Sequence, residues 1–201
     1  MSKNAIATLA PRQDLRHKVG DAILSVVLRV PKSGEDEIEQ PEARARALGR
    51  SAARQASLIA GSMALPPGIL GWLTIVPELL SVWKLQAQMV SDIAAVYGKS
   101  ASLGREQMVY CLFKHVSAQL FRDVVVRVGE RFVIQRASLG FLQSAAQMLG
   151  VKMTQKIIGK SAVRFVPLIG AVGVSAYAYF DTTQVAKTAI ELFSKDIVID
   201  I

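Results

Sequence analysis

Apolar residues recur every three or four positions along most of the chain, which is the spacing of one helix face. A clear example lies within residues 12–30, where Leu15, Val19, Ala22, Ile23, Val26, Val27 and Val30 share such a face. Pro31 follows and ends this amphipathic helix, because proline lacks a backbone N–H and clashes with the preceding turn. No convincing run of alternating apolar and polar residues appears, so the pattern predicts an all-α protein.

Residues 31–41 differ from their neighbours. The sequence PKSGEDEIEQP is acidic, bracketed by prolines and poor in apolar residues, which predicts a flexible linker. Pro41 opens the next helix, because its missing N–H would be unpaired in a first helical turn anyway. We therefore divide the chain into an amphipathic helix with an acidic linker, residues 1–40, and a helical domain, residues 41–201.

Two long stretches carry no charged side chain, the 23 residues of 55–77 and the 16 residues of 165–180. The first is long enough to span a bilayer, but Leu65-Pro66-Pro67-Gly68 interrupts it and bars a continuous helix. The second has Pro167 near its start and glycines within it. We expect each to form a helical hairpin that enters apolar surroundings and returns. The predicted fold is a multi-helix bundle with two hairpins broken by proline and glycine.

The cleanest predicted helix covers residues 78–97, directly after Pro77 and before Gly98. It is apolar around most of its circumference, which indicates a helix that is buried or lies against lipid. Residues 103–136 are predicted to form one long helix, or two joined near Gly129.

The C-terminal part continues the helical pattern. Residues 138–164 predict a pair of helices rich in small residues, with Gly150 as their junction. A final helix runs through Thr183 and Ile190 and ends near Lys195. The tail KDIVIDI alternates as a strand would, but we expect it to be frayed, as chain ends commonly are.

The net charge of +8 favours an anionic partner, either nucleic acid or the negative leaflet of a membrane. No nucleic-acid-binding motif is present, and the mean hydropathy of +0.33 is high for a cytosolic chain. We therefore expect anionic lipid. The expected lipid-facing cations are Arg44, Arg46, Arg50, Arg54, Lys156, Lys160 and Arg164. The residues expected to insert are Leu65, Pro66, Pro67, Ile69, Leu70, Trp72, Leu168, Ile169 and Val172.

Candidate chemistry is sparse. The hydrolase, nucleotide-binding and zinc motifs are absent, and Cys111 is the single cysteine, so no internal disulfide forms. Cys111 and His115 are spaced as two metal ligands or a thiol–imidazole pair could be, but nothing nearby completes a site. We predict no catalytic residue, metal or cofactor. Gln86 falls on an apolar helix side, so it should be buried and hydrogen-bonded to the backbone of residues 66–71 or to Asp92.

Residues 45–193 resemble the EcsC protein family. The resemblance lies in Pro67-Gly68, residues 71–78, Trp83, Gln86, Ile93-Ala94, Tyr97-Gly98, Val166-Pro167, residues 169–171, Gly173, Phe180, Ala186 and Ala189. The family often has an asparagine in the segment that reads Ser175-Ala176-Tyr177 here, and this chain lacks it. The resemblance implies a bacterial, membrane-linked protein and supplies no catalytic residues.

These observations lead to one main hypothesis, a non-enzymatic membrane-associated protein that binds anionic phospholipid through the two hairpins and their basic flanks. The chain has no visible signal peptide, so we expect it on the cytoplasmic side, peripheral or monotopic on the inner membrane. A membrane protein or a second copy of the chain would also fit as a partner, but nucleic acid would not. The alternatives are a soluble all-α binding or scaffold module with both segments in its core, and an enzyme in which His115 or Asp92 converges with a second titratable group.

Overall fold

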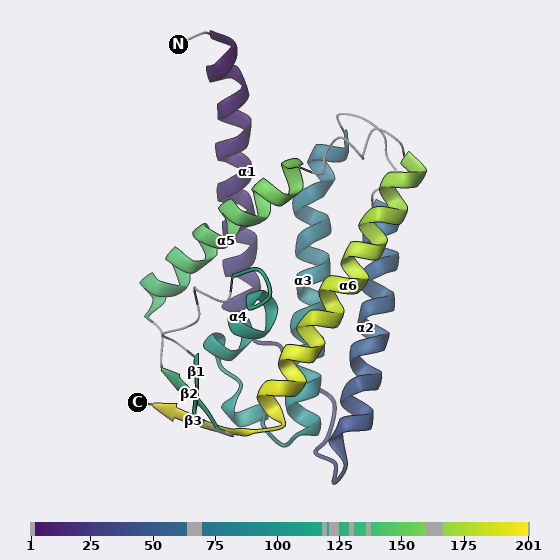
Figure 1. Ribbon diagram of the computed structural model, residues 1–201, viewed down its shortest axis with the longest axis vertical. Coiled ribbons are helices and arrows are strands. Elements are labelled where there is room, and N and C mark those ends of the chain that lie inside the picture. Colours follow the sequence, from purple (N-terminus) through teal and green to yellow (C-terminus); the bar gives the residue numbers. More distant parts are fainter. Residues whose placement is uncertain are drawn as a thin grey trace.

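The computed structural model describes residues 3–63, 70–117, 120, 125–128, 131–135, 138–159 and 167–200. Within these residues the chain forms six α-helices, one 3-10 turn and a three-stranded sheet (Figure 1). The elements are α1 (Lys3–Val27), α2 (Pro41–Met63), α3 (Leu70–Val96), η1 (Ser100–Ser102), α4 (Arg105–Phe113), β1 (Val125–Val128), β2 (Arg131–Gln135), α5 (Leu139–Gly159), α6 (Pro167–Phe193) and β3 (Asp196–Asp200). The predicted all-α multi-helix bundle is confirmed, with a small sheet added to it.

Helix α3 lies at the centre of the bundle and contacts α1, α2, α4 and α6, while α5 packs on α1 (Figure 1). Its apolar circumference is thereby covered, and Trp83, Val90 and Ile93 are fully or almost fully buried. The Trp83 ring meets the edge of Phe113 on α4, with centroids 5.5 Å apart. The apolar face predicted for residues 12–30 enters the same core, through Val19 and its neighbours on α1.

Two helix boundaries differ from the prediction. Helix α3 begins at Leu70 and contains Pro77, so the proline removes one backbone hydrogen bond without ending the helix. At the other end the prediction is confirmed, because Gly98 adopts a φ of +66°, which favours glycine at the end of a helix. Helix α5 runs unbroken through Gly150, which we expected to be a junction. A Cβ there would lie 2.9 Å from the Arg16 carbonyl oxygen, so this glycine allows α5 to approach α1 closely.

The predicted long helix over residues 103–136 is wrong beyond Phe113. The chain forms β1 and β2 instead, paired antiparallel with Val128 opposite Arg131. The C-terminal tail adds β3 parallel to β2, with Phe132 opposite Ile197, so its strand-like alternation is confirmed and we find a paired strand where we expected a frayed end. Valine and isoleucine dominate these segments, and their branched side chains favour strands.

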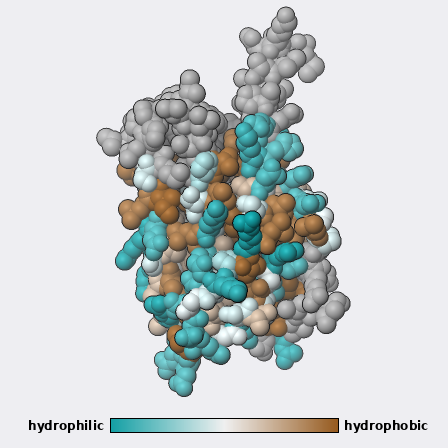
Figure 2. All heavy atoms as spheres, turned by 180° about the vertical axis from the view of Figure 1, so that it is seen from behind, coloured by the Kyte–Doolittle hydropathy of each residue, from teal (hydrophilic) through white to brown (hydrophobic). Residues whose placement is uncertain are grey.

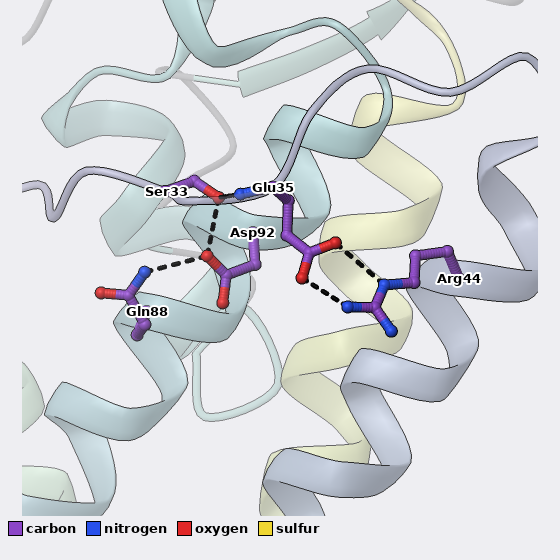
Figure 3. A network of polar contacts seen from close by, with 5 residues as sticks. All are labelled: Ser33, Glu35, Arg44, Gln88 and Asp92. Carbon is purple, nitrogen blue, oxygen red and sulfur yellow. Dashed lines mark hydrogen bonds and ion pairs between the residues drawn. The ribbon is translucent and has the colours of Figure 1, made fainter.

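Residues 28–40, which we call the strap, cross the bundle in irregular conformation and are fastened to two helices (Figure 3). The Ser33 hydroxyl donates to the Asp92 carboxylate at 2.7 Å, and the Gln88 amide donates to the same oxygen at 2.9 Å. The Arg44 guanidinium binds both carboxylate oxygens of Glu35, at 2.9 and 2.6 Å. The predicted linker is therefore non-helical, as expected, but it is tied to α3 and α2 by side-chain hydrogen bonds.

Four helix ends meet at one end of the molecule. Helix α2 ends there and α3 begins there, and α5 ends and α6 begins there (Figure 1). The turn of the first predicted hairpin falls within residues 64–69, which lie outside the described residues. The second prediction is wrong for residues 167–180, which run through α6 as one continuous helix because its glycines do not interrupt the backbone hydrogen bonds. Both apolar segments are nevertheless connected to the bundle at this same end, which we call the hairpin end.

Candidate functional site

The outer face of α2 changes from basic to apolar toward the hairpin end. Arg46, Arg50, Arg54 and Leu58 follow one another at intervals of four residues, so they lie along one side of the helix. All four are exposed, and Leu58 is 73% exposed despite its apolar side chain. The charge-free part of α2 is thus nearest the hairpin end, with the arginines below it.

Helix α6 carries a matching apolar surface. Val172 is 72% exposed and Phe180 is 61% exposed, and Tyr177 and Tyr179 are partly exposed, at 37% and 41%. Figure 2 shows the opposite side of the molecule from Figure 1, where hydrophobic and hydrophilic side chains are interspersed over the described surface. Large exposed apolar patches commonly mark the sites where a protein binds a partner, a ligand or a membrane.

A shallow depression, which we call the α2–α6 hollow, lies between these two helices near the hairpin end. The residues around it include Ser57, Leu58, Gly61, Val172, Ala176 and Tyr179. Its walls are mostly small side chains, and its rim carries the exposed apolar ones. Below it the helices touch, since a Cβ on Gly49 would lie 2.8 Å from the Cβ of Ala186.

Only part of the predicted insertion set falls on described side chains. Residues 65–67 and Ile69 lie outside the described residues. Leu70 and Trp72 belong to α3, and Leu168 and Ile169 belong to α6, each at the helix end that starts from the hairpin end. Val172 is the member whose exposure the structure gives, and it faces solvent.

The structure likewise describes only some of the side chains of the predicted lipid-facing cations. Arg44 is bound to Glu35 of the strap, and Arg46 forms an ion pair of 3.1 Å with Glu42 one turn away. Arg50 and Arg54 form no ion pair within the described part of the chain. Lys156 lies on α5, and residues 160 and 164 lie outside the described residues. Two of the seven predicted cations are therefore engaged within the protein, and two are exposed and free.

A buried polar cluster ties α6 to α3 and to the residues after α4. Gln86 is fully buried, as predicted, but the predicted bond to Asp92 is wrong, and most of the other predicted partner, the backbone of residues 66–71, lies outside the described residues. Its amide nitrogen donates to the Asp181 carboxylate at 2.9 Å and to the Thr182 hydroxyl at 3.0 Å. The other Asp181 oxygen lies 2.7 Å from His115 Nε2, so one carboxylate joins three segments. Asp92 instead accepts a hydrogen bond from Ser33 of the strap.

In this cluster His115 meets a second titratable group, Asp181, which is the arrangement that the enzyme hypothesis predicts. The His115 and Asp181 side chains are only 18% and 8% exposed, and His115 Nδ1 and Gln86 Oε1 are buried without a hydrogen-bond partner among the described residues. Burial and the neighbouring Asp181 carboxylate raise the pKa of Tyr177 to about 12. The arrangement therefore orients His115 and holds the helices together, but it offers little access to a substrate.

Cys111 adds no chemistry to this cluster. Its side chain is fully buried, and this burial raises the pKa of the thiol well above its usual range. A thiol that stays protonated is a poor nucleophile and a poor metal ligand. Among the described residues, no group of histidine, cysteine and acidic side chains could hold a metal ion.

The cluster could not be found from sequence spacing, because Asp181 is 95 positions from Gln86 and 66 from His115. One signal was available: Asp181 is the first charged residue after the apolar stretch of residues 165–180. A charge that interrupts an apolar helix commonly has a buried partner.

None of the described helices has the combination of length and apolar character that crossing a bilayer requires. Comparison of the chain with protein families, curated proteins and solved structures gives no match. The resemblance to the EcsC family therefore stays a prediction.

Proposed function

We propose that this protein is a non-enzymatic helical protein that binds the anionic surface of a membrane with its hairpin end. The observation that carries the proposal is the exposure of Leu58 and Val172 at the end where both apolar segments join the bundle. Large aliphatic side chains on two adjacent helices are costly to leave in water. Burial in lipid removes that cost. The proposed location is the cytoplasmic face of the inner membrane, as a peripheral or monotopic protein.

The basic residues of α2 support the same orientation. Arg54 and Arg50 lie about one and two turns below Leu58, where phosphate groups would be if Leu58 entered the acyl region. Each cation near an anionic membrane contributes about 1 kcal/mol, and full burial of each aliphatic side chain contributes about 1.5–3 kcal/mol. Together these four side chains contribute about 5–8 kcal/mol before association costs. That amount fits reversible binding, to which the first hairpin turn would add.

Flotation of the full chain with vesicles tests the proposal. The protein should float with vesicles of phosphatidylglycerol and phosphatidylcholine, float less as salt is raised, and stay unbound with phosphatidylcholine alone. The double variant Arg50→Glu/Arg54→Glu should weaken binding at least tenfold. Arg29→Glu/Arg105→Glu makes the same change in net charge at two exposed arginines on other segments, and it should float nearly as wild type does.

Two outcomes would count against the proposal. If the same amount of protein stayed in the unbound fraction with and without anionic lipid, the proposal would be refuted and the soluble scaffold module would be favoured instead. An equal loss of flotation in both double variants would show that only net charge matters, and would remove the assigned role of α2.

A further inference from the structure

We propose that the α2–α6 hollow holds one acyl chain of an anionic phospholipid, whose phosphate is bound by Arg50, Arg54 and Lys187. This inference rests on the proposed membrane function and goes beyond it, because it assigns an individual lipid to a built site. A protein that merely adheres to a membrane needs no such site.

The hollow has the shape and chemistry for an alkyl chain. Small residues on both helices, among them Ser57, Gly61 and Ala176, leave a furrow between α2 and α6. Leu58 and Val172 stand at its rim and are each more than two-thirds exposed. An alkyl chain laid in the furrow would cover these apolar groups and would need no hydrogen-bond partner. The furrow lies near the hairpin end, where the proposed membrane would be.

Cations gather below the hollow on both helices. Gly49 of α2 lies against Ala186 of α6, so the next residues along the chain, Arg50 and Lys187, lie near the same contact. Arg54 is one turn above Arg50, toward the hollow. All three side chains are exposed, and none forms an ion pair within the described residues.

No acidic residue occurs between positions 42 and 78, so α2 supplies no carboxylate beside Arg50 and Arg54, and Glu191, one turn from Lys187 on α6, is paired with Lys114. Like charges held close together repel one another, and a bound anion relieves that repulsion. The order along the helices, apolar toward the hairpin end and basic below it, matches a phospholipid whose chain points into the membrane and whose phosphate lies at its surface.

The same charges argue against a second copy of the chain as the occupant. In a symmetric dimer that buried the hollow with its two-fold axis along these helices, the cations of one copy would lie beside those of the other, and like-charge contacts across an interface are unfavourable. A phospholipid supplies the opposite charge and the apolar chain in one molecule.

The test uses dihexanoylphosphatidylglycerol below its micelle concentration, titrated into the full chain by calorimetry. We expect one lipid per protein and binding that weakens with salt. Inorganic phosphate and dihexanoylphosphatidylcholine should each bind at least tenfold more weakly. Ala176→Phe, which fills the hollow without changing charge, should reduce affinity at least tenfold. Ala43→Phe is the matched control at an exposed alanine of α2 that does not line the hollow, and it should leave the affinity unchanged.

Three results would overturn the inference. No saturable binding of the short-chain lipid, together with normal flotation on anionic vesicles, would exclude the lipid site and leave the proposed membrane function intact. Failure of both assays would remove both proposals. A protein of doubled mass in solution, made monomeric by Ala176→Phe, would assign the hollow to a second copy of the chain.

Discussion

Replacing Asp181 by alanine removes the acceptor that joins α6 to α3 and to His115. The variant leaves a Gln86 amide hydrogen and the His115 Nε2–H without their partner at buried or mostly buried positions. Each buried donor that loses its acceptor costs about 1–3 kcal/mol. Gln86 keeps its second bond to Thr182 and His115 is partly accessible to water, so we expect a total loss of about 2–4 kcal/mol.

Urea denaturation followed by circular dichroism measures this loss, and thermal melting should show a fall of about 5–15 °C for a chain of this size. Asp181→Asn separates hydrogen bonding from charge. Its amide oxygen can accept from Gln86, and its nitrogen can donate to His115 Nε2 once the imidazole proton has moved to Nδ1, so the loss should be about 1 kcal/mol. Asp21→Ala changes an exposed helical aspartate and should stay within about 0.5 kcal/mol of wild type. An alanine variant as stable as this control would refute the assigned role of the cluster.

Three further predictions concern packing and pH. Gly150→Ala should destabilise the protein by about 1–3 kcal/mol in urea denaturation, because the added Cβ has no room against α1. Gly140→Ala on the same helix should be neutral or slightly stabilising. If both variants had the same free energy of unfolding, the close approach of α5 to α1 would be contradicted. The hydrogen bond from Arg44 holds the pKa of Glu35 below its usual range, so this carboxylate stabilises the fold above its ordinary titration range and loses that contribution as pH falls. Glu35→Gln should therefore be less stable than wild type at pH 7, and the difference should shrink as pH falls through the acidic range; a difference that stays constant as pH falls would be inconsistent with this reasoning. The raised pKa of Tyr177, about 12 instead of 10, predicts a loss of stability as pH rises from 10 to 12, and Tyr177→Phe should lessen that loss in alkaline urea melts.

Helical faces could be predicted from the sequence because their spacing is local. The positions chosen within residues 12–30 are largely buried, and Val19 and Ile23 are completely so. Gln86 was correctly predicted to be buried, since its neighbours at helical spacing are apolar. Its partner could not be predicted, because no local pattern links Gln86 to a carboxylate 95 positions away.

The sheet was missed for two physical reasons. Valines in the run from 124 to 128 fit a helical face and a strand equally well, and such short apolar runs are ambiguous by periodicity alone. The pairing that decides between them is also non-local, because β2 lies parallel to β3 at the far end of the chain. For the strap, the acidic residues indicated a flexible, solvent-exposed linker, yet Glu35 binds Arg44 of α2.

The candidate surface was predictable in part. Charge-free stretches and the arginines before the first of them are visible in the sequence, and they include Arg50, Arg54, Leu58 and Val172 of the candidate surface. The engagement of Arg44 and Arg46 by nearby glutamates was not visible, and neither was the hollow, which depends on how closely α2 and α6 approach each other.

Quenching of tryptophan fluorescence by brominated lipid tests the central claim most directly. Trp83 is 2% exposed and packed against Phe113, so its emission should not respond to lipid. Trp72 lies in the first turn of α3, at the hairpin end. We predict that brominated anionic vesicles quench the wild-type protein and leave Trp72→Phe unquenched. If the vesicles left the emission of the wild-type protein unchanged, as they should that of Trp72→Phe, insertion of the hairpin end would be contradicted.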